Sequence, residues 1–460
     1  MNPDWAGLVR SAHPSIVLPP GSRRAQVQVS GPLELERVLD LGAGHGVAVV
    51  RSAQAERWCV PLIAEGEQVR RSMPGDGTAK RLVRQLAAGG TRVDGDDFGT
   101  LSFIEQSPAD QAAAVPLQPG ERGVEVDQTN DSVIVDEAVV VKWSTRLPSI
   151  DEPGSPAASR ITALVRAGFV DMPAPIGFLT AGSTTRQGQL LATAVAYLPG
   201  AEDGWDWATA DLRAYLSGAL SLAEAVEPAR RLGAMTARMH AGLASMGSEP
   251  ATADRARSWQ QQARSELADA VDAVTGPFAE RLARWRGRIT EALDALALMA
   301  GTPTIAIHGD LHVGQVLRTR GAGGVDRLHV TDFDGNPTLP IIERWAPQPA
   351  AVDVVGMLAS VDHVGRVVQY RDAGSDLGMI RTWIAAAQQA YLAAYRGQAA
   401  DLGIASLLDE RLLEPWRLWQ EVREIRYAVA HLPHWVYVPE LALADLLPEH
   451  PPNTHRPRST

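Results

Sequence analysis

The chain has 460 residues, of which 45% are hydrophobic and 21% are charged, and its formal net charge at pH 7 is -11. This length predicts two or three packed units, at about 100–200 residues per domain. The acidic balance excludes the class of basic nucleic-acid-binding proteins, because affinity for a phosphate backbone needs clustered Lys and Arg. Cys59 is the only cysteine, so no intrachain disulfide can form, and we expect a cytoplasmic location.

Neither a membrane span nor a secretory signal is expected. The apolar runs are far shorter than the roughly 20 residues that a spanning helix needs. The first 20 residues have neither a basic start nor a long apolar stretch. The sequence leaves the oligomeric state open.

Residues 1–120 are predicted to form an N-terminal cap subdomain. Short alternating apolar runs between residues 25 and 63 predict strands, and a helix is expected over residues 80–88. The glycines at 42, 44 and 46 lack the spacing of a dinucleotide-binding turn. A Pro-, Gly- and Gln-rich segment at 106–120 indicates the end of this unit.

Residues 121–200 are predicted to form a second sheet-rich unit. The β-branched runs at 132–135 and 138–143 flank Asp136-Glu137, which predicts a hairpin that ends near Lys142. A helix is expected over 156–168 and a strand over 187–198.

Residues 201–460 are predicted to be mostly helical. Helical segments are expected between 211 and 299 and between 353 and 430. Two short β-branched runs, 304–307 and 328–331, interrupt them, and each run lies beside a polar cluster.

These two clusters carry the strongest chemical signal in the sequence. The first is His308-Gly-Asp310-Leu-His312-Val-Gly-Gln315, and the second is Thr331-Asp332-Phe-Asp334-Gly335. Phosphoryl transfer needs a carboxylate that accepts the proton of the attacking hydroxyl, and oxygen ligands that hold Mg²⁺ on nucleotide phosphates. Asp310 is therefore the predicted catalytic base, and Asp332 and Asp334 are predicted metal ligands.

Two further residues fit the same chemistry. Gln315 stands five positions after Asp310, which matches the spacing between the catalytic-loop Asp and its metal-binding amide in kinases, with Gln in place of Asn. Lys142 ends the predicted hairpin, where a lysine that contacts the α- and β-phosphates is expected. The chain has only one other lysine, Lys80.

Each of these residues also has a purely structural interpretation. Asp310 and His312 could cap a helix, and Asp332 could close a turn. His308 is expected to be a packed loop residue, and for His312 a loop role and a contact with substrate are equally favoured. The order of the two clusters, each after a β-branched run, favours the catalytic interpretation.

On these motifs the chain resembles the actinobacterial maltokinases and, more closely, the related glucosamine kinases. Maltokinases have H-G-D-L-H-L-G-Q-V-L and D-F-E-G-E-P, where this chain has residues 308–317 and Asp-Phe-Asp-Gly-Asn-Pro at 332–337. The resemblance implies an α+β, eukaryotic-protein-kinase-like fold with a sheet-rich N-lobe, a helical C-lobe and an N-terminal cap. It also implies that ATP and Mg²⁺ are used.

The resemblance assigns further residues to nucleotide binding. Residues 195–198, which follow the predicted strand and precede Asp203-Gly-Trp205, are implied to present backbone groups to adenine. Within this segment, Val195, Tyr197 and Leu198 are expected to contact the nucleotide. The segment 127–132, which ends in Ser132, stands where protein kinases have a Gly-rich loop, and it is expected to cap the phosphates.

The chain departs from the family at one place. Maltokinases have a helix glutamate that pairs with the strand lysine, whereas this chain has Ser-Pro-Ala-Ala-Ser-Arg at 155–160. Ser159 cannot form that ion pair. Another carboxylate, such as Asp332, is therefore expected to hold Lys142, or else the helix is placed differently.

A polar cluster near the C-terminus is the candidate for sugar recognition. On a helix, Gln420, Arg423, Glu424 and Tyr427 share one face, and amide, guanidinium, carboxylate and aromatic groups together suit a pyranose. Glu421 is a second carboxylate, which favours a protonated amino group. The alternative is a charged helix face laced by Glu–Arg pairs. The similarity of this segment to the glucosamine kinases favours recognition.

The expected function is an alcohol-group phosphotransferase that transfers the γ-phosphoryl group of ATP to the 6-hydroxyl of D-glucosamine, with weak activity on glucose. Asp310 and His312 are expected to contact the sugar as well. The alternatives are a maltokinase, an aminoglycoside phosphotransferase and a nucleotide-binding regulator without turnover. An intact Asp310 argues against the regulator, because a pure binder does not need a proton acceptor.

Overall fold

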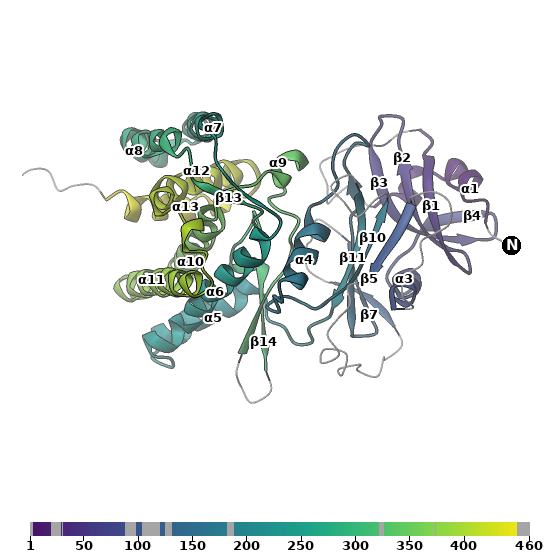
Figure 1. Cartoon of the computed structure of the whole chain (residues 1–460), viewed down its shortest axis with the longest axis horizontal. Coiled ribbons are helices and arrows are strands. Elements are labelled where there is room, and N and C mark those ends of the chain that lie inside the picture. Colours follow the sequence, from purple (N-terminus) through teal and green to yellow (C-terminus); the bar gives the residue numbers. More distant parts are fainter. Residues whose placement is uncertain are drawn as a thin grey trace, which may run out of the picture. The chain divides into compact units, whose positions relative to one another are not determined.

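The computed structural model describes residues 3–19, 29, 31–87, 98–103, 120–124, 131–181, 188–321, 326–372 and 374–448. The chain divides into two compact units. Unit 1 consists of Met1–Ala201 with Thr319–Ala346, and unit 2 consists of Glu202–Arg318 with Pro347–Thr460. The two larger sheets belong to unit 1, and most of the helices belong to unit 2 (Figure 1).

The first sheet of unit 1 is antiparallel and has the strand order β1-β2-β3-β4, with β9 paired to β3. Its strands are β1 (Glu34–Gly42), β2 (His45–Arg51), β3 (Arg57–Glu65), β4 (Gln68–Arg71) and β9 (Arg146–Leu147). Gly42 and Gly44, which lack the spacing of a dinucleotide-binding turn, lie at the β1–β2 turn, where Gly42, Ala43 and Gly44 have positive φ. Helices α1 (Trp5–Ser11) and α2 (Pro14–Val17) supply Trp5, Val9 and Val17 to a hydrophobic cluster on this sheet.

The second sheet of unit 1 has the order β5-β10-β11-β8-β7-β6. Its strands are β5 (Phe98–Phe103), β6 (Glu121–Gly123), β7 (Asp131–Val135), β8 (Val139–Trp143), β10 (Pro175–Ala181) and β11 (Gln189–Ala196). The predicted hairpin is β7–β8. Asp136 and Glu137 at its turn have φ of 53° and 52°, as a two-residue turn with positive φ at both positions requires.

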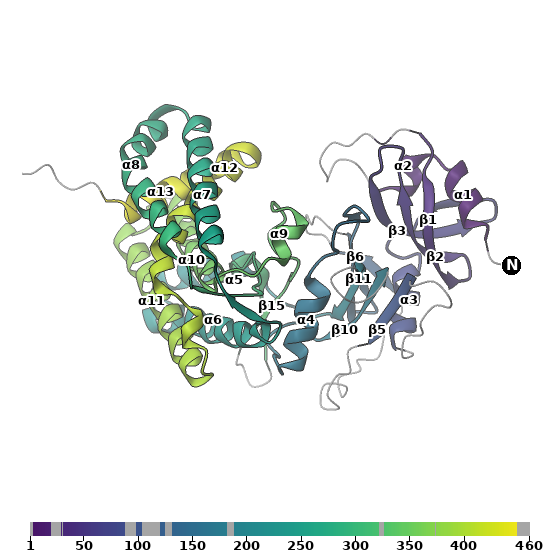
Figure 2. The same ribbon diagram turned by 45° about the horizontal axis from the view of Figure 1, so that its top comes forward.

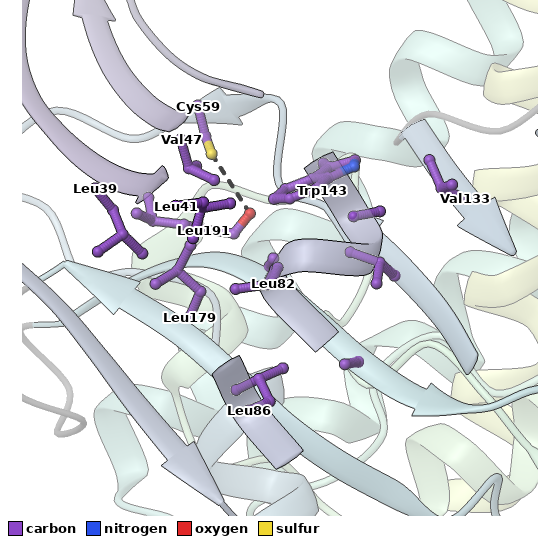
Figure 3. Close-up of a cluster of buried hydrophobic side chains, with 14 of the residues drawn as sticks. Leu39, Leu41, Val47, Cys59, Leu82, Leu86, Val133, Trp143, Leu179 and Leu191 are labelled. Carbon is purple, nitrogen blue, oxygen red and sulfur yellow. Dashed lines mark hydrogen bonds between the residues drawn. The ribbon is translucent and has the colours of Figure 1, made fainter. Parts of the chain in front are cut away.

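One hydrophobic core joins the two sheets of unit 1. Figure 3 shows Leu39, Leu41 and Val47 from the first sheet packed with Trp143, Leu179 and Leu191 from the second. Helix α3 (Thr78–Ala87) adds Leu82 and Leu86. Cys59 belongs to this core, and burial raises the pKa of its thiol, which indicates a packing role.

The remaining elements of unit 1 lie before and after the first segment of unit 2, Glu202–Arg318, in the sequence. Helix α4 (Ala157–Arg166) contacts β11 (Figure 1). Strand β15 (Asp326–Val330) and helix α9 (Ile341–Trp345) belong to Thr319–Ala346, and β14 (Val316–Arg320) spans the division between the units. The metal-ligand motif follows β15 directly.

Unit 2 is built mainly from helices. They are α5 (Gly204–Leu216), α6 (Leu222–Ala244), α7 (Ala253–Ala273), α8 (Gly276–Asp294), α10 (Ala351–Arg371), α11 (Leu377–Asp401), α12 (Leu413–His431) and α13 (Tyr437–Leu446). Short 3-10 turns are η3 (Ala295–Leu298), η4 (Val313–Gln315), η5 (Ala405–Leu407), η6 (Glu410–Leu412) and η7 (Pro433–Trp435), and strands β12 (Ser248–Pro250) and β13 (Pro303–Ile305) form a small sheet.

Helix α10 is the centre of unit 2, since it is buried over almost its whole length and packs on α5, α11, α12 and α13. Helices α7, α8 and α12 pack together beside it (Figure 2). Helices α6 and α11 approach closely at Gly233, where an added Cβ would lie 2.0 Å from the carbonyl oxygen of Tyr391.

The predicted strands and helices that fall on described residues are present. Residues 25–28 of the first predicted strand, most of the 106–120 segment and residues 127–130 lie outside the described part. The predicted boundary of the cap at residue 120 therefore stays a prediction. Within the part that the structure describes, no helix is long and apolar enough to cross a membrane.

Candidate active site

The loop that carries Asp310 is held by helix α10 of unit 2. Asp353, in the first turn of α10, accepts the backbone N–H groups of His308 at 2.7 Å and Gly309 at 2.8 Å. Its carboxylate also lies 3.1 Å from Nε2 of His240. Burial would raise the pKa of Asp353, but His240, His308 and the N–H of Gly309 lower it below its usual value. A buried carboxylate thus fixes the start of the loop.

His308 and His312 shape the same loop. His308 is fully buried, and its Nδ1 accepts the backbone N–H of Asp310, which confirms the predicted packing role. His312 caps η4, because its Nδ1 accepts the N–H of Gly314. Burial lowers the pKa of His312, against the opposing effects of Asp310 and Asp203, so a neutral imidazole stands beside Asp310.

The start of helix α5 presses on this loop. An added Cβ at Gly204 would lie 1.7 Å from the carbonyl oxygen of Val313, so only glycine permits the approach. Asp203 caps the helix by accepting the N–H of Trp205. The Asp-Gly-Trp sequence at 203–205 therefore supports the catalytic loop of unit 2.

A second group of predicted site residues lies in unit 1, around Lys142. Its ammonium donates to Oδ1 of Asp332 at 2.7 Å and to Oδ2 of Asp334 at 2.8 Å. The expectation that Asp332 pairs with this lysine is confirmed. Ser155, for which the sequence predicted no role, donates to Oδ1 of Asp334.

The charges in this cluster depend on one another. Burial opposes the positive charge of Lys142, but Asp334 and Asp332 outweigh burial and raise its pKa. For Asp334, Lys142 and the hydrogen bonds from Asp332, Lys142 and Ser155 outweigh burial, and its pKa is lowered. Burial and the neighbouring Asp334 raise the pKa of Asp332. The proton therefore stays on Lys142 at neutral pH.

The two carboxylates beside Lys142 are the predicted metal ligands. Over the described residues, no group of three or more His, Cys, Asp or Glu side chains could hold a metal ion. Mg²⁺ needs no such cage, because it takes one or two carboxylates together with substrate phosphates and water. Asp332 and Asp334 of unit 1 provide hard oxygen donors of this kind, and the third predicted ligand, Gln315, belongs to unit 2.

The predicted adenine segment has most of its N–H groups engaged. Val195 pairs with Val140 and with Pro175 in the sheet. The N–H groups of Ala196 and Tyr197 donate at 2.8 Å to the carbonyls of Ala174 and Ala138. We therefore expect the purine edge to meet Leu198.

The side chain of Tyr197 and the position of Ser132 are also defined within unit 1. The hydroxyl of Tyr197 accepts from Arg122 at 3.0 Å, which ties the adenine segment to β6. Ser132 is the cross-strand partner of Lys142 on β7 and β8.

Helix α12 brings part of the predicted sugar cluster to a buried histidine. His363 of α10 lies 3.1 Å from Oε2 of Glu421, and Glu421 is fully buried. Burial would lower the pKa of His363, but Glu421 outweighs it and raises that pKa. Glu424 is also close enough to influence His363, and Gln420 donates to Glu424 at 3.0 Å.

The charge of His363 also contributes to lowering the pKa of His312, after the larger effect of burial. Sequence reasoning missed His363. The only signal was a histidine inside an apolar helical run, which also fits an ordinary core residue.

The other two members of the cluster lie elsewhere. Arg423 donates to Glu266 of α7 at 3.1 Å, and its guanidinium lies 4.1 Å from the ring centroid of Trp419. Tyr427 is 44% exposed and lies beside His431. The contact of Arg423 matches the alternative of a Glu–Arg pair, so its role in sugar binding stays a prediction.

Comparison with known proteins identifies the relatives of this chain. The model of the phosphotransferase enzyme family matches residues 122–400. A glucosamine kinase of Streptacidiphilus jiangxiensis is 54% identical over 450 residues, which cover 98% of this chain and 99% of that protein. A glucosamine kinase of Mycolicibacterium smegmatis is 38% identical over 423 residues, which cover 91% of this chain and 99% of that protein.

Solved structures agree with the sequence relatives. A glucosamine kinase in crystal form B has a TM-score of 0.86 and 52% identity, and covers 97% of this chain and 100% of that one. A glucosamine kinase in complex with glucosamine, ADP and inorganic phosphate has a TM-score of 0.84 and 52% identity, with the same coverage. The predicted kinase-like α+β fold is confirmed. This chain belongs to the phosphotransferase enzyme family and, within it, to the glucosamine kinases.

Proposed function

We propose that this chain transfers the γ-phosphoryl group of ATP to the 6-hydroxyl of D-glucosamine, which yields glucosamine 6-phosphate and ADP. The observation that carries the proposal is 54% identity to a glucosamine kinase over nearly the whole chain, with Asp310 and Asp332 at the expected places of both motifs. A related structure holds glucosamine and ADP, which are the acceptor and one product of the proposed reaction, together with inorganic phosphate. A cytoplasmic location is part of the proposal, since the reaction consumes ATP.

The reaction needs one proton acceptor and a means of stabilising phosphate charge. The oxygen of the 6-hydroxyl forms a bond to the γ-phosphorus, the bond from that phosphorus to the bridging oxygen of ADP breaks, and the hydroxyl proton passes to Asp310. Asp332, Asp334 and Gln315 would hold Mg²⁺. The ion would neutralise phosphate charge and so make the leaving group more stable.

Lys142 and Leu198 complete the proposed nucleotide contacts. The raised pKa of Lys142 keeps it cationic, as a contact with α- and β-phosphates requires. Leu198 follows the two engaged N–H groups of the adenine segment. Ser132 is proposed to lie near the phosphates, because it stands across the hairpin from Lys142.

The proposed contacts for the sugar come from unit 2. Glu424 is partly buried, and burial together with Glu421 raises its pKa. A carboxylate in that setting gains from an ammonium partner, so Glu424 is proposed to bind the amino group of glucosamine. Gln420 and His312 are proposed to bind sugar hydroxyls.

A coupled assay of ADP release tests the function. Glucosamine, glucose, maltose, N-acetylglucosamine and an aminoglycoside are compared with ATP and Mg²⁺. We expect kcat/KM for glucosamine to exceed that for glucose at least tenfold, and the other three to react more slowly still. Preference for maltose would place the activity with the maltokinases, and an absence of turnover with all five would contradict a kinase.

The role of Asp310 is tested by Asp310→Asn, which keeps the shape of the side chain and removes its basicity. We expect turnover to fall at least 100-fold, within the range that a general base contributes, while calorimetry shows unchanged binding of MgADP. Loss of turnover together with loss of MgADP binding would contradict the assignment of Asp310 as the base.

A further inference from the structure

Helix α4 contacts the metal-ligand motif through the side chain of an arginine. The helix contains no Asp or Glu, so it cannot supply the carboxylate that pairs with the strand lysine in relatives of the fold. Arg160 of α4 is instead directed at the motif. Its side chain is almost fully buried, with a relative exposure of 3%.

The guanidinium of Arg160 binds backbone carbonyls on both sides of the bend that follows β15. One nitrogen, Nη1, donates to the carbonyl of Phe333 at 2.8 Å, and Nη2 donates to the carbonyl of Arg344 at 2.5 Å. Phe333 stands between Asp332 and Asp334. A planar guanidinium can hold two acceptors at once, which a lysine ammonium on a flexible stem cannot reproduce.

Ser155 adds a second contact just before the helix. Its hydroxyl donates to Oδ1 of Asp334 and accepts the N–H of Ala157 at 3.2 Å. The indole N–H of Trp345 donates to the carbonyl of Gly154 at 2.7 Å. The segment around Ser155 therefore both donates a hydrogen bond to Asp334 and accepts one from Trp345.

The motif needs such support because its backbone is unusual. Asp332 has a φ of 62°, in the left-handed region that non-glycine residues seldom adopt. Such a conformation persists only where the surrounding structure enforces it. At Gly335 an added Cβ would lie 3.0 Å from Nη1 of Arg160, so the glycine leaves space for the guanidinium.

We infer that Arg160 and Ser155 are positioning residues that set the direction of the Asp332 and Asp334 carboxylates toward the nucleotide-bound Mg²⁺. They connect helix α4 to the motif through its backbone and the Asp334 carboxylate, whereas the maltokinase glutamate acts on the strand lysine. The inference rests on the proposed function in one respect, namely that this motif holds MgATP.

The test uses Arg160→Lys and Ser155→Ala in the full chain, with Arg166→Lys as the matched control. Arg166 lies on the same helix and is exposed, so its substitution leaves the motif untouched. Calorimetry measures the dissociation constant of ADP with and without Mg²⁺. The ratio of the two constants reports how well the motif holds the metal, whatever the acceptor is.

We expect Arg160→Lys to reduce the Mg²⁺-dependent gain in ADP affinity at least tenfold and Ser155→Ala at least threefold. ADP affinity without Mg²⁺ and the KM for glucosamine should stay within twofold of wild type in both. A merely structural role would lower the melting temperature without changing that gain. The inference is wrong if both folded variants keep the wild-type gain, or if Arg166→Lys loses as much. If Arg160→Lys does not fold, Ser155→Ala decides alone.

Discussion

Lys142 lies between two carboxylates, and this arrangement explains how a chain without the helix glutamate keeps its strand lysine charged. A lysine on a partly buried strand loses its proton easily when it has no partner. Asp332 and Asp334 lie within 2.8 Å of the ammonium and reverse that tendency. The positive charge of Lys142 therefore depends on its two carboxylate partners.

His363 and Glu421 form the second buried charge pair at the residue scale, and it predicts a pH dependence of stability. Because Glu421 raises the pKa of His363 above 6.5, the pair stabilises the folded chain fully below about pH 6.5. That contribution is lost as the pH rises through the raised pKa. Glu421→Gln removes the contribution at every pH.

We therefore expect the difference in the free energy of unfolding between wild type and Glu421→Gln to be largest at pH 6 and to shrink steadily toward pH 9. Urea unfolding at half-unit pH steps measures it. Glu414→Gln on the same helix is the control, because Glu414 is exposed and its difference from wild type should not vary with pH. A constant difference for Glu421→Gln would show that His363 does not become protonated in the folded chain.

At the scale of elements, α10 connects the core of unit 2 to the catalytic loop. Its Asp353 uses both oxygens, one for the N–H of His308 and His240, the other for the N–H of Gly309. Asp353→Asn puts an NH₂ group where one acceptor is needed. Leaving a buried partner unpaired costs about 3–5 kcal/mol, so we expect a loss of that order in the free energy of unfolding.

Asp372→Asn is the matched control for α10. Asp372 lies just after the helix and pairs with Arg213 at the surface, where such pairs contribute about 0–1 kcal/mol. Chemical unfolding compares the two variants. Equal losses would contradict the idea that Asp353 supports the loop, whereas a large loss with reduced kcat for Asp353→Asn alone would support it.

The sequence predicted the elements that depend on local patterns. The β7–β8 hairpin followed from β-branched runs around Asp136-Glu137, and Asp310 and Asp332 followed from motif spacing. Asp353, His363 and Arg160 could not be predicted in their roles. Each acts through a partner far away in the sequence, such as Arg160 with the carbonyl of Phe333, 173 positions later. A single sequence does not show which distant backbone group a buried side chain will meet.

At the scale of the whole molecule, the residues proposed for catalysis are divided between the two units. Asp310, Gln315 and Glu424 belong to unit 2, whereas Lys142 and Asp332 belong to unit 1. Asp332 follows Asp310 by only 22 positions. The two residues still lie in different units, because the chain returns to unit 1 after Arg318. The division suggests that binding of the sugar and binding of the nucleotide can be altered separately.

Two single substitutions test this separation. Glu424→Gln removes the charge proposed for the amino group, and a lost charge-assisted hydrogen bond of about 1.5–3 kcal/mol corresponds to roughly 10- to 150-fold. We expect the KM for glucosamine to rise by that factor while the dissociation constant of MgADP stays within twofold. Lys142→Met should do the reverse, with at least a tenfold weaker affinity for MgADP and an unchanged KM for glucosamine. If either variant weakens both ligands equally, the two sites are coupled through the whole molecule, and the assignment of one ligand to each unit is wrong.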